Sequence, residues 1–353
     1  MKVPVSALYE KLLCLLPHHG LLGSLLNPCP RLLRQYSCSK TELVTATDLI
    51  SYWKDVFEAN EIPEAQASSE YIVSHVLGAK TFQSLNASNI ARYFTLLFRE
   101  QSLCPKRISK MPVQYVLGEW DFQDLTLKMK PPVFIPRPET EELVSLVLKD
   151  KYKKKKLSSA CCRDIWQPPD PLGPVILEIG CGSGAIALSL LRKLPQSRAI
   201  AIDKLETAVN LTKENAERLQ LQKRIKILHH DVFSSSWECL LHWGLVDIII
   251  SNPPYVFHED MSHLAPEILR YEDLGALEGG HDGMTIIKEI LNLAPYILKD
   301  FGSMFLEVDP RHPKMVKNWL HSHPDLSLFV SATHKDFCGK PRFLHIQKYK
   351  RRS

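Results

Sequence analysis

The 353-residue chain contains no apolar run that approaches the ~18–20 residues of a membrane-spanning helix, so we expect no membrane segment. Its nine cysteines form no C-x-x-C pair, and no cluster of cysteine and histidine has zinc-ligand spacing, so no metal site is expected. The adjacent Cys161 and Cys162 are a weaker candidate for a redox or metal feature. A scattered, odd set of cysteines is typical of reduced thiols inside a cell. No internal repeat is visible, and the net charge of +5 falls short of a dedicated nucleic-acid binder.

Acidic residues are scarce in the first forty residues, where Glu10 is the single acid among five lysines and arginines. The segment is rich in leucine, and several of its leucines can form one face of a short helix. Acid-poor amphipathic segments with arginine and serine are typical of organelle transit peptides, and "RQYSCS" near Arg34 resembles a matrix-peptidase cleavage site. We therefore interpret residues 1–40 as a mitochondrial transit peptide that directs the protein to the matrix. A disordered or loosely packed N-terminus is the alternative.

The remaining length suggests about two domains. Residues 45–105 have helical periodicity, with Thr45 or Thr47 as an N-cap, Gly78 as a helix end and a further helix over 87–101. This pattern predicts a small N-terminal helical bundle. It holds no residue types of a catalytic site, and its many acids are unfavourable for binding DNA.

Residues 110–150 predict a connecting hairpin and a helix. The helix is expected to begin near Pro138, because proline presets φ and the acids Glu139 and Glu141 suit the positive first turn. Residues 151–172 are dense in charge and then rich in serine, cysteine and proline, so they predict a flexible linker.

Short apolar strands alternate with helical patterns across residues 173–350. This order predicts an α/β domain with a parallel, doubly wound sheet.

A glycine-rich turn follows the first strand of this domain and opens a helix, in the sequence "LEIGCGSGAIAL". Glycines there permit a tight turn and close approach of a ligand to the backbone. The spacing G-x-G-x-G differs from the dinucleotide fingerprint, and the acid before it would repel a pyrophosphate. A ligand with a positive charge fits better, which favours S-adenosylmethionine over NAD. The candidate cofactor-binding residues are Glu178, Gly180, Cys181, Gly182, Ser183 and Gly184.

Two acids follow the next two strands. Asp203 is placed to accept hydrogen bonds from the ribose hydroxyls, as the acid about 20 residues beyond the glycine turn does in nucleotide-binding sheets. Asp231 is placed to meet the adenine amino group, with Val232 and Phe233 flanking the ring. A helix N-cap or a capping acid is the alternative for each aspartate.

The fourth strand ends in Asn252-Pro253-Pro254-Tyr255, where the two prolines cannot continue a strand ladder. A planar NH₂ group is a poor nucleophile, because its lone pair is delocalised. To accept the methyl group of S-adenosylmethionine, it must be held in line with that methyl group. The Asn252 side-chain oxygen and the Pro253 carbonyl can accept its two hydrogens, and Tyr255 offers a flat face. Positioning and electrostatics then provide most of the catalysis. A structural Pro-Pro turn is the alternative.

These motifs together resemble the class I S-adenosylmethionine-dependent methyltransferases that act on planar nitrogen. With "PVQYVLGEWDF", "FIPRPETEELV" and "EGGHDGM", residues 45–348 resemble more narrowly the PrmC/HemK family, the protein-(glutamine-N5) methyltransferases of peptide-chain release factors. The transit-like N-terminus suggests the mitochondrial member. The resemblance implies a Rossmann-like sheet with a small N-terminal helical domain that docks the release factor.

The resemblance also implies site residues. Asn252 would hold the substrate amide and lie near the cofactor, Phe134 would help to wall the glutamine pocket, and Arg137 and Thr140, with Glu139, would shape the site or touch cofactor. The chain departs from the family at Glu178, often aspartate there, and at Val232, often aromatic.

The leading hypothesis is methylation of the glutamine in the Gly-Gly-Gln motif of mitochondrial release factors. The enzyme is expected to be a monomer with no direct nucleic-acid substrate. The alternatives are an adenine N6-methyltransferase of DNA or RNA, glutamine methylation of a ribosomal protein, and a non-catalytic binding module.

Overall fold

The computed structural model describes residues 46–84, 102–160 and 173–350. The transit peptide predicted at 1–40 and the helix predicted at 87–101 lie outside these residues. The chain divides into two compact units, Met1–Leu49 and Ile50–Ser353.

The N-terminal region is helical, as the periodicity predicts. Its elements are α3 (Ala46–Ala59), α4 (Ala65–Val76), the short 3-10 helix η1 (Phe82–Ser84) and a helical segment over 102–108. Gly78 follows the end of α4 with φ of 74°, as a residue that ends a helix does. Thr47 is wrong as an N-cap because α3 already begins at Ala46. Phe57, Ile72 and Cys104 pack in a small core.

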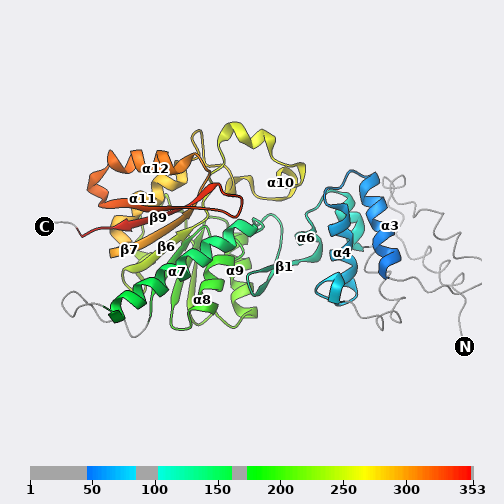
Figure 1. Ribbon diagram of the computed structural model, residues 1–353, viewed down its shortest axis with the longest axis horizontal. Coiled ribbons are helices and arrows are strands. Elements are labelled where there is room, and N and C mark those ends of the chain that lie inside the picture. The colour runs from blue at the N-terminus through cyan, green and yellow to red at the C-terminus, as the bar shows by residue number, and fades with distance from the viewer. Residues whose placement is uncertain (1–45, 85–101, 161–172, 351–353) are drawn as a thin grey trace, which may run out of the picture. The chain divides into compact units, whose positions relative to one another are not determined.

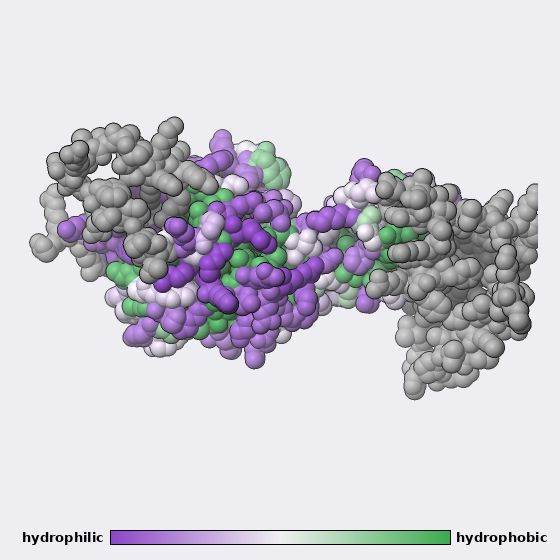
Figure 2. Space-filling model, turned by 90° about the horizontal axis from the view of Figure 1, so that it is seen from below, coloured by the Kyte–Doolittle hydropathy of each residue, from purple (hydrophilic) through white to green (hydrophobic). Residues whose placement is uncertain are grey.

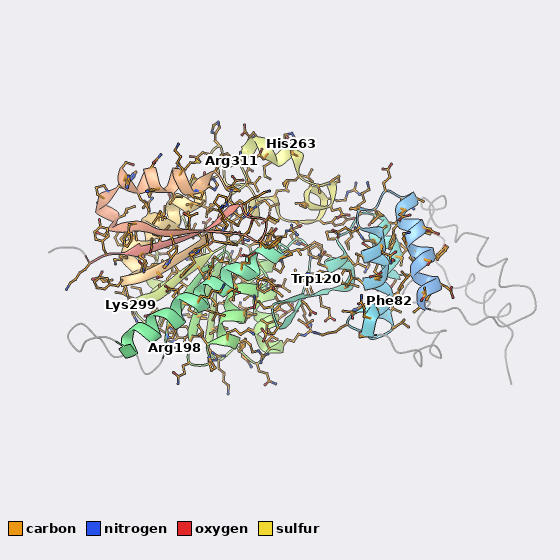
Figure 3. All side chains as sticks on the ribbon, viewed as in Figure 1. Phe82, Trp120, Arg198, His263, Lys299 and Arg311 are labelled. Carbon is orange, nitrogen blue, oxygen red and sulfur yellow. The ribbon has the colours of Figure 1, made fainter. Side chains whose placement is uncertain are left out.

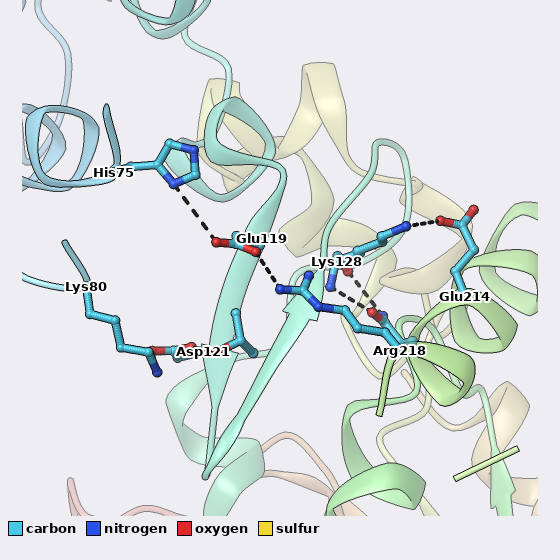
Figure 4. A network of polar contacts seen from close by, with 9 residues as sticks. His75, Lys80, Glu119, Asp121, Lys128, Glu214 and Arg218 are labelled. Atoms are coloured by element: carbon cyan, nitrogen blue, oxygen red, sulfur yellow. Dashed lines mark hydrogen bonds and ion pairs between the residues drawn. The ribbon is translucent and has the colours of Figure 1, made fainter. Parts of the chain in front are cut away.

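The predicted hairpin is confirmed as β1 (Glu119–Phe122) and β2 (Leu125–Lys128), and a short helix that was not predicted, α6 (Val113–Leu117), precedes it. Figure 4 shows the hairpin beside α9 (Glu206–Arg218). There the buried Asn215 accepts a hydrogen bond from the Lys128 amide at 2.7 Å and donates to its carbonyl at 3.2 Å. The exposed ion pair of Arg218 and Glu119, 2.9 Å apart, contributes less to holding the hairpin on α9 than these hydrogen bonds do, since solvent screens its charges.

Helix α7 (Pro138–Ala160) begins at the predicted proline, with Glu139 and Glu141 in its first turn. It continues through residues 151–160, so the linker predicted over 151–172 is wrong in its first ten residues. The rest of that segment lies outside the described residues.

A seven-stranded sheet forms the larger part of the structure, with the order β5-β4-β3-β6-β7-β9-β8. The first five strands in this order are parallel, and β9 is antiparallel to both of its neighbours. The strands are β3 (Val175–Ile179), β4 (Arg198–Asp203), β5 (Ile225–His229), β6 (Val246–Ser251), β7 (Leu298–Glu307), β8 (Leu328–Lys335) and β9 (Pro341–Lys348). This arrangement confirms the predicted class I methyltransferase fold, although the sequence did not predict the antiparallel direction of the last strands.

Helices cover both faces of the sheet. Successive residues of β3 point to opposite faces, so Ile176 joins one core and Leu177 the other. The first core contains residues of α7, α8 and α9, which lie in front of the strands in Figure 1, and the second contains residues of α11 and α12. The remaining helices are α8 (Ala185–Lys193), α10 (Pro266–Tyr271), α11 (Thr285–Ile297) and α12 (His312–His321). The short 3-10 helices are η3 (Glu238–Leu241), η4 (His258–His263), η5 (Leu274–Ala276) and η6 (Pro324–Leu326).

The surface of the described residues is mixed in polarity, and hydrophilic side chains dominate the face seen in Figure 2. Within the described ranges, no helix is both long and apolar enough to span a membrane. The same ranges contain no group of three His, Cys, Asp or Glu residues that could bind a metal ion.

Candidate active site

A cavity opens where β3 and β6 lie side by side. The chain leaves β3 toward β4 and β5 and returns to β6 on the other side, which makes this pair the topological switch point where open α/β sheets bind ligands. Most of the predicted site residues line this cavity: Phe134, Thr140, Glu178, Gly180, Cys181, Gly182, Ser183, Asp203, Asp231, Val232, Asn252, Pro253 and Pro254. The fold therefore brings the cofactor motifs and the Asn-Pro-Pro segment to one place.

Five residues that were predicted at the site lie outside the lining of this cavity: Arg137, Glu139, Gly184, Phe233 and Tyr255. Gly184 has φ of 82°, and a Cβ there would lie 2.9 Å from side-chain atoms of Leu188 and Thr212. Packing at the start of α8 thus requires a glycine at this position, and Gly184 does not border the cavity.

The glycine turn is held by hydrogen bonds from two neighbouring segments. Asp203 accepts one from the Gly182 amide at 2.9 Å and one from the Leu205 amide at 2.9 Å. Thr212 donates to the Gly182 carbonyl at 2.9 Å, and Asn215 donates to the Ser183 carbonyl at 2.9 Å. Burial raises the pKa of Asp203, and its two amide donors counteract that rise. Sequence reasoning missed Thr212 and Asn215, because neither belongs to a recognisable motif.

Glu178 is 1% exposed and accepts a hydrogen bond from the Ala187 amide in the first turn of α8 at 2.9 Å. Burial raises the pKa of its carboxyl well above the ordinary value. The acid before the glycine turn therefore also satisfies a free amide at a helix start, which sequence spacing alone did not indicate.

The segment after β5 lines the cavity only in part. Asp231 and Val232 border it, whereas Phe233 is 53% exposed and does not. Asp231 also accepts a hydrogen bond from the Phe233 amide at 3.0 Å, as in a local turn. The expectation that Phe233 flanks the adenine is thus contradicted. Apolar residues that were not predicted, Leu205, Ala276 and Ile286, line the cavity.

Asn252 follows β6 and takes part in a buried polar chain. Its Nδ2 donates to the Thr140 hydroxyl at 3.2 Å, and Thr140 donates to Glu307 Oε2 at 2.8 Å. The Tyr255 hydroxyl donates to Glu307 Oε1 at 3.1 Å, and Tyr255 is not among the residues that line the cavity. Burial raises the pKa of Tyr255, and the Glu307 charge raises it further. Sequence reasoning missed Glu307, although an acid that ends β7, the neighbour of β6, was an available signal.

A second segment supports the backbone of Asn-Pro-Pro-Tyr. The Val256 amide donates to the Leu277 carbonyl at 2.9 Å, and the Gly279 amide donates to the Val256 carbonyl at 2.8 Å. A Cβ at Gly279 would lie 2.8 Å from the Pro254 carbonyl oxygen, and one at Gly283 would lie 2.6 Å from that of Tyr255. The glycines of "EGGHDGM" thus permit close approach to the Asn-Pro-Pro-Tyr backbone.

The chain just beyond Tyr255 is fixed as well. Phe257 stacks on His312 with ring centroids 5.0 Å apart. The guanidinium of Arg311, a residue labelled in Figure 3, lies 3.5 Å from the centre of the Phe257 ring. These contacts anchor the exit from the site on the start of α12.

Arg137 acts on the cavity wall indirectly. Its guanidinium lies 4.7 Å from the ring centre of Phe134 and pairs with the buried Glu272 at 2.6 Å. Glu272 also accepts a hydrogen bond from the Ile135 amide at 3.2 Å. Arg137 therefore holds Phe134 in the lining without reaching the cavity itself.

The sheet order, the glycine turn after β3 and the amide-bearing turn after β6 define a class I S-adenosylmethionine-dependent methyltransferase. The family model of the methyltransferase small domain matches residues 169–316.

Known relatives narrow this class. The chain is 56% identical to the MTRF1L release factor glutamine methyltransferase of Homo sapiens, over 87% of this chain and 88% of that protein. It is 36% identical to the release factor glutamine methyltransferase of Thermodesulfovibrio yellowstonii (71% of this chain, 81% of that protein) and 33% identical to that of Synechocystis sp. (67% and 73%). The chain belongs to the release factor glutamine methyltransferases, the PrmC/HemK family. It is a protein-glutamine methyltransferase that uses S-adenosylmethionine.

Proposed function

We propose that this enzyme methylates the glutamine side-chain nitrogen in the Gly-Gly-Gln motif of mitochondrial release factors, acting as a monomer in the matrix. The observation that carries the proposal is the 56% identity to the human MTRF1L release factor glutamine methyltransferase over most of both chains. The acid-poor, leucine-rich first forty residues support the mitochondrial location.

The residues of the cavity fit S-adenosylmethionine. A Cβ added at Gly180 would meet nothing within 4 Å, and one at Gly182 would reach only a Val133 methyl at 4.0 Å, so the backbone of the turn is open to a ligand. We assign Gly180 to Ser183 to the methionine part, Asp203 to the ribose, and Asp231 with Val232 to the adenine. Bound S-adenosylmethionine would supply an electrophilic methyl group and would keep, on its sulfur, the electron pair of the carbon–sulfur bond that breaks. The methylated amide nitrogen would lose one proton to solvent.

The remaining residues hold the substrate amide. In this proposal the Asn252 side-chain oxygen and the Pro253 carbonyl accept the two hydrogens of the glutamine NH₂, which leaves its lone pair aligned with the methyl carbon. Phe134 walls the pocket for the alkyl part of the glutamine. Tyr255, bonded to Glu307, holds the Pro-Pro turn in position.

The acceptors also explain selection of glutamine over glutamate. A carboxylate has no hydrogens to offer, so glutamate would leave two acceptors unpaired, at a cost of roughly 1–3 kcal/mol each.

The proposal is tested with the full chain, labelled S-adenosylmethionine and three separate substrates: a mitochondrial release factor, the same factor with the motif glutamine replaced by glutamate, and DNA. We expect label on the intact factor alone, with mass spectrometry locating one methyl group on the motif glutamine. Label on DNA, or equal label on the glutamate form, would overturn the proposal.

Asn252→Ala tests the role of the side-chain amide. We expect methyl transfer to fall by about a hundredfold or more, as when one preorganised polar group of an active site is removed. Cofactor affinity, measured by calorimetry, should stay close to that of the wild type. Loss of cofactor binding with unchanged turnover at saturating cofactor would show that Asn252 serves the cofactor instead.

A further inference from the structure

Three residues from three elements form a continuous chain of hydrogen bonds that leads from the cavity wall into the protein interior. Thr140 lies in α7, Asn252 follows β6, and Glu307 ends β7. Thr140 is 2% exposed and Glu307 is 1% exposed, so solvent does not compete for their hydrogen bonds. Thr140 borders the cavity together with Asn252, whereas Glu307 does not border it. Glu307 therefore has access to the site only through its partners.

The hydrogens of this chain have one consistent arrangement when Glu307 is ionised. A carboxylate can only accept, so the single hydrogen of the Thr140 hydroxyl is directed to Glu307, 2.8 Å away. The Thr140 oxygen then has only lone pairs left for Asn252, and Asn252 must present its NH₂ group, at 3.2 Å. The Oδ1 atom of Asn252 accepts no hydrogen bond from the residues that the structure describes, and Asn252 lines the cavity.

We propose that Glu307, acting through the Thr140 hydroxyl, fixes which end of the Asn252 carboxamide faces the substrate, and is thus a positioning residue for methyl transfer. This inference rests on the proposed function, in which Asn252 Oδ1 accepts a hydrogen from the glutamine NH₂. With the carboxamide reversed, its NH₂ group would face the NH₂ group of the substrate, and two donors cannot bond each other.

Protonation of Glu307 removes this constraint. The added proton can be donated to Thr140, whose own hydrogen is then free to point at Asn252 and to favour the reversed carboxamide. The charged and titratable groups that face Glu307 are Tyr255 after β6, Arg342 in β9 and Glu139 in α7. Burial raises the pKa of Glu307 to about 7, although the bonds from Thr140 and Tyr255 and the Arg342 charge oppose the rise. Turnover should therefore fall as the pH drops below about 7.

A pair of matched substitutions at Thr140 tests the hydrogen-bond chain from Glu307 to Asn252. Thr140→Val keeps the shape of the side chain and removes the hydroxyl, and Thr140→Ser keeps the hydroxyl. We expect Thr140→Val to lower kcat about tenfold or more, with the KM for the release factor and the affinity for S-adenosylmethionine changed less than about threefold. Thr140→Ser should retain most of the wild-type kcat. Equal losses in both variants, or full activity in Thr140→Val, would overturn the proposal.

The pH profile of kcat separates the role of Glu307 from a packing role. We expect the wild type to lose activity below about pH 7, where the Glu307 carboxyl takes up its proton. Glu307→Gln should have a lower kcat over the whole pH range and should not show the additional fall in kcat below about pH 7. Glu217→Gln, which removes an exposed acid of α9, is the control and should keep the wild-type profile. If the fall in kcat below about pH 7 persists unchanged in Glu307→Gln, the proposal is contradicted.

A measurement without substrate distinguishes failure of this inference from failure of the proposed function. The side-chain NH₂ resonance of Asn252, followed by NMR in the full chain, should shift with a midpoint near pH 7 in the wild type and stay constant in Thr140→Val and Glu307→Gln. If this titration is present but no release factor is methylated, the proposed substrate is wrong, and the hydrogen-bond chain from Glu307 through Thr140 to Asn252 is still supported. If the Asn252 resonance does not titrate in the wild type, the coupling to Glu307 is refuted whatever the substrate.

Discussion

Glu307 is an acid buried to 1% exposure, and ionising it in that position opposes folding. Its pKa is about 7 in the folded protein, against 4.5 as the ordinary value, so between these pH values the folded state binds the proton that the unfolded state releases. The raised pKa therefore contributes stability that is present at low pH and is lost as the pH rises through about 7.

This linkage gives a stability prediction for the same residue. Between about pH 8 and pH 6 the wild type should gain free energy of unfolding, on the order of 1 kcal/mol, relative to Glu307→Gln, which has no proton to bind. Urea unfolding of both proteins at the two pH values measures the difference. A constant difference between them would show that the Glu307 carboxyl does not titrate in this range.

Single residues could be predicted where a local motif restricts the chemistry. Residues 180–183 of the glycine turn, Asp203 and Asn252 were predicted to share one site, and all of them line the same cavity. Thr212 contacts the glycine turn from a segment distant in the sequence, and no local pattern predicts that contact. Glu307 could have been noticed as an acid that ends a strand, but its contact with Thr140 depends on the tertiary fold. Gly184, Tyr255 and Phe233 do not line the cavity, because a sequence motif does not tell which of its residues, or of their neighbours, the fold turns toward the cavity.

At the scale of elements, the strand-helix alternation predicted the parallel part of the sheet, because buried parallel strands and amphipathic helices have distinct periodicities. It did not predict that β9 runs antiparallel to its neighbours. The extension of α7 to Ala160 was missed, since a run of lysines has the composition of a linker although it can continue a helix. The pairing of Val256 with residues 277–279 was missed because it joins two irregular segments. Such contacts depend on tertiary packing and not on sequence pattern.

This pairing leads to a prediction about Gly283. A Cβ there would lie 2.6 Å from the Tyr255 carbonyl oxygen and 2.6 Å from His312 Nε2, so Gly283→Ala should push the loop away from the Asn-Pro-Pro-Tyr backbone. We expect a lower Tm and a clear fall in kcat. Gly339→Ala is the matched control, because Gly339 also has positive φ but has nothing within 4 Å of its Cβ position. If the two variants lose the same stability and keep the same kcat, backbone strain alone would explain the effect.

At the scale of the whole molecule, the segment between Asn-Pro-Pro-Tyr and the EGGHDGM motif also bonds to the helical region within the unit Ile50–Ser353. Arg107, 3% exposed, donates to Ser68 Oγ at 3.0 Å, to the Pro63 carbonyl at 2.9 Å and to Glu267 in α10. Tyr271 of the same helix donates to the Ser109 carbonyl at 2.8 Å. Helix α10 is thus bonded to the helical region within this unit.

Glu267 supplies the negative charge that compensates the buried Arg107. In Glu267→Ala the guanidinium keeps its neutral acceptors but loses this charge, and a buried charge that has lost its partner destabilises a protein by about 3–5 kcal/mol. Because Glu267 is itself 19% exposed and water can reach the vacated site, we expect a smaller loss, on the order of 1–3 kcal/mol, seen as a Tm lower by several degrees. Glu259→Ala is the control: Glu259 belongs to the same segment but is 77% exposed, and its ion pair with Arg311 is long, at 3.8 Å. Equal Tm values for the two variants would mean that the Arg107–Glu267 pair does not hold α10 against the helical region.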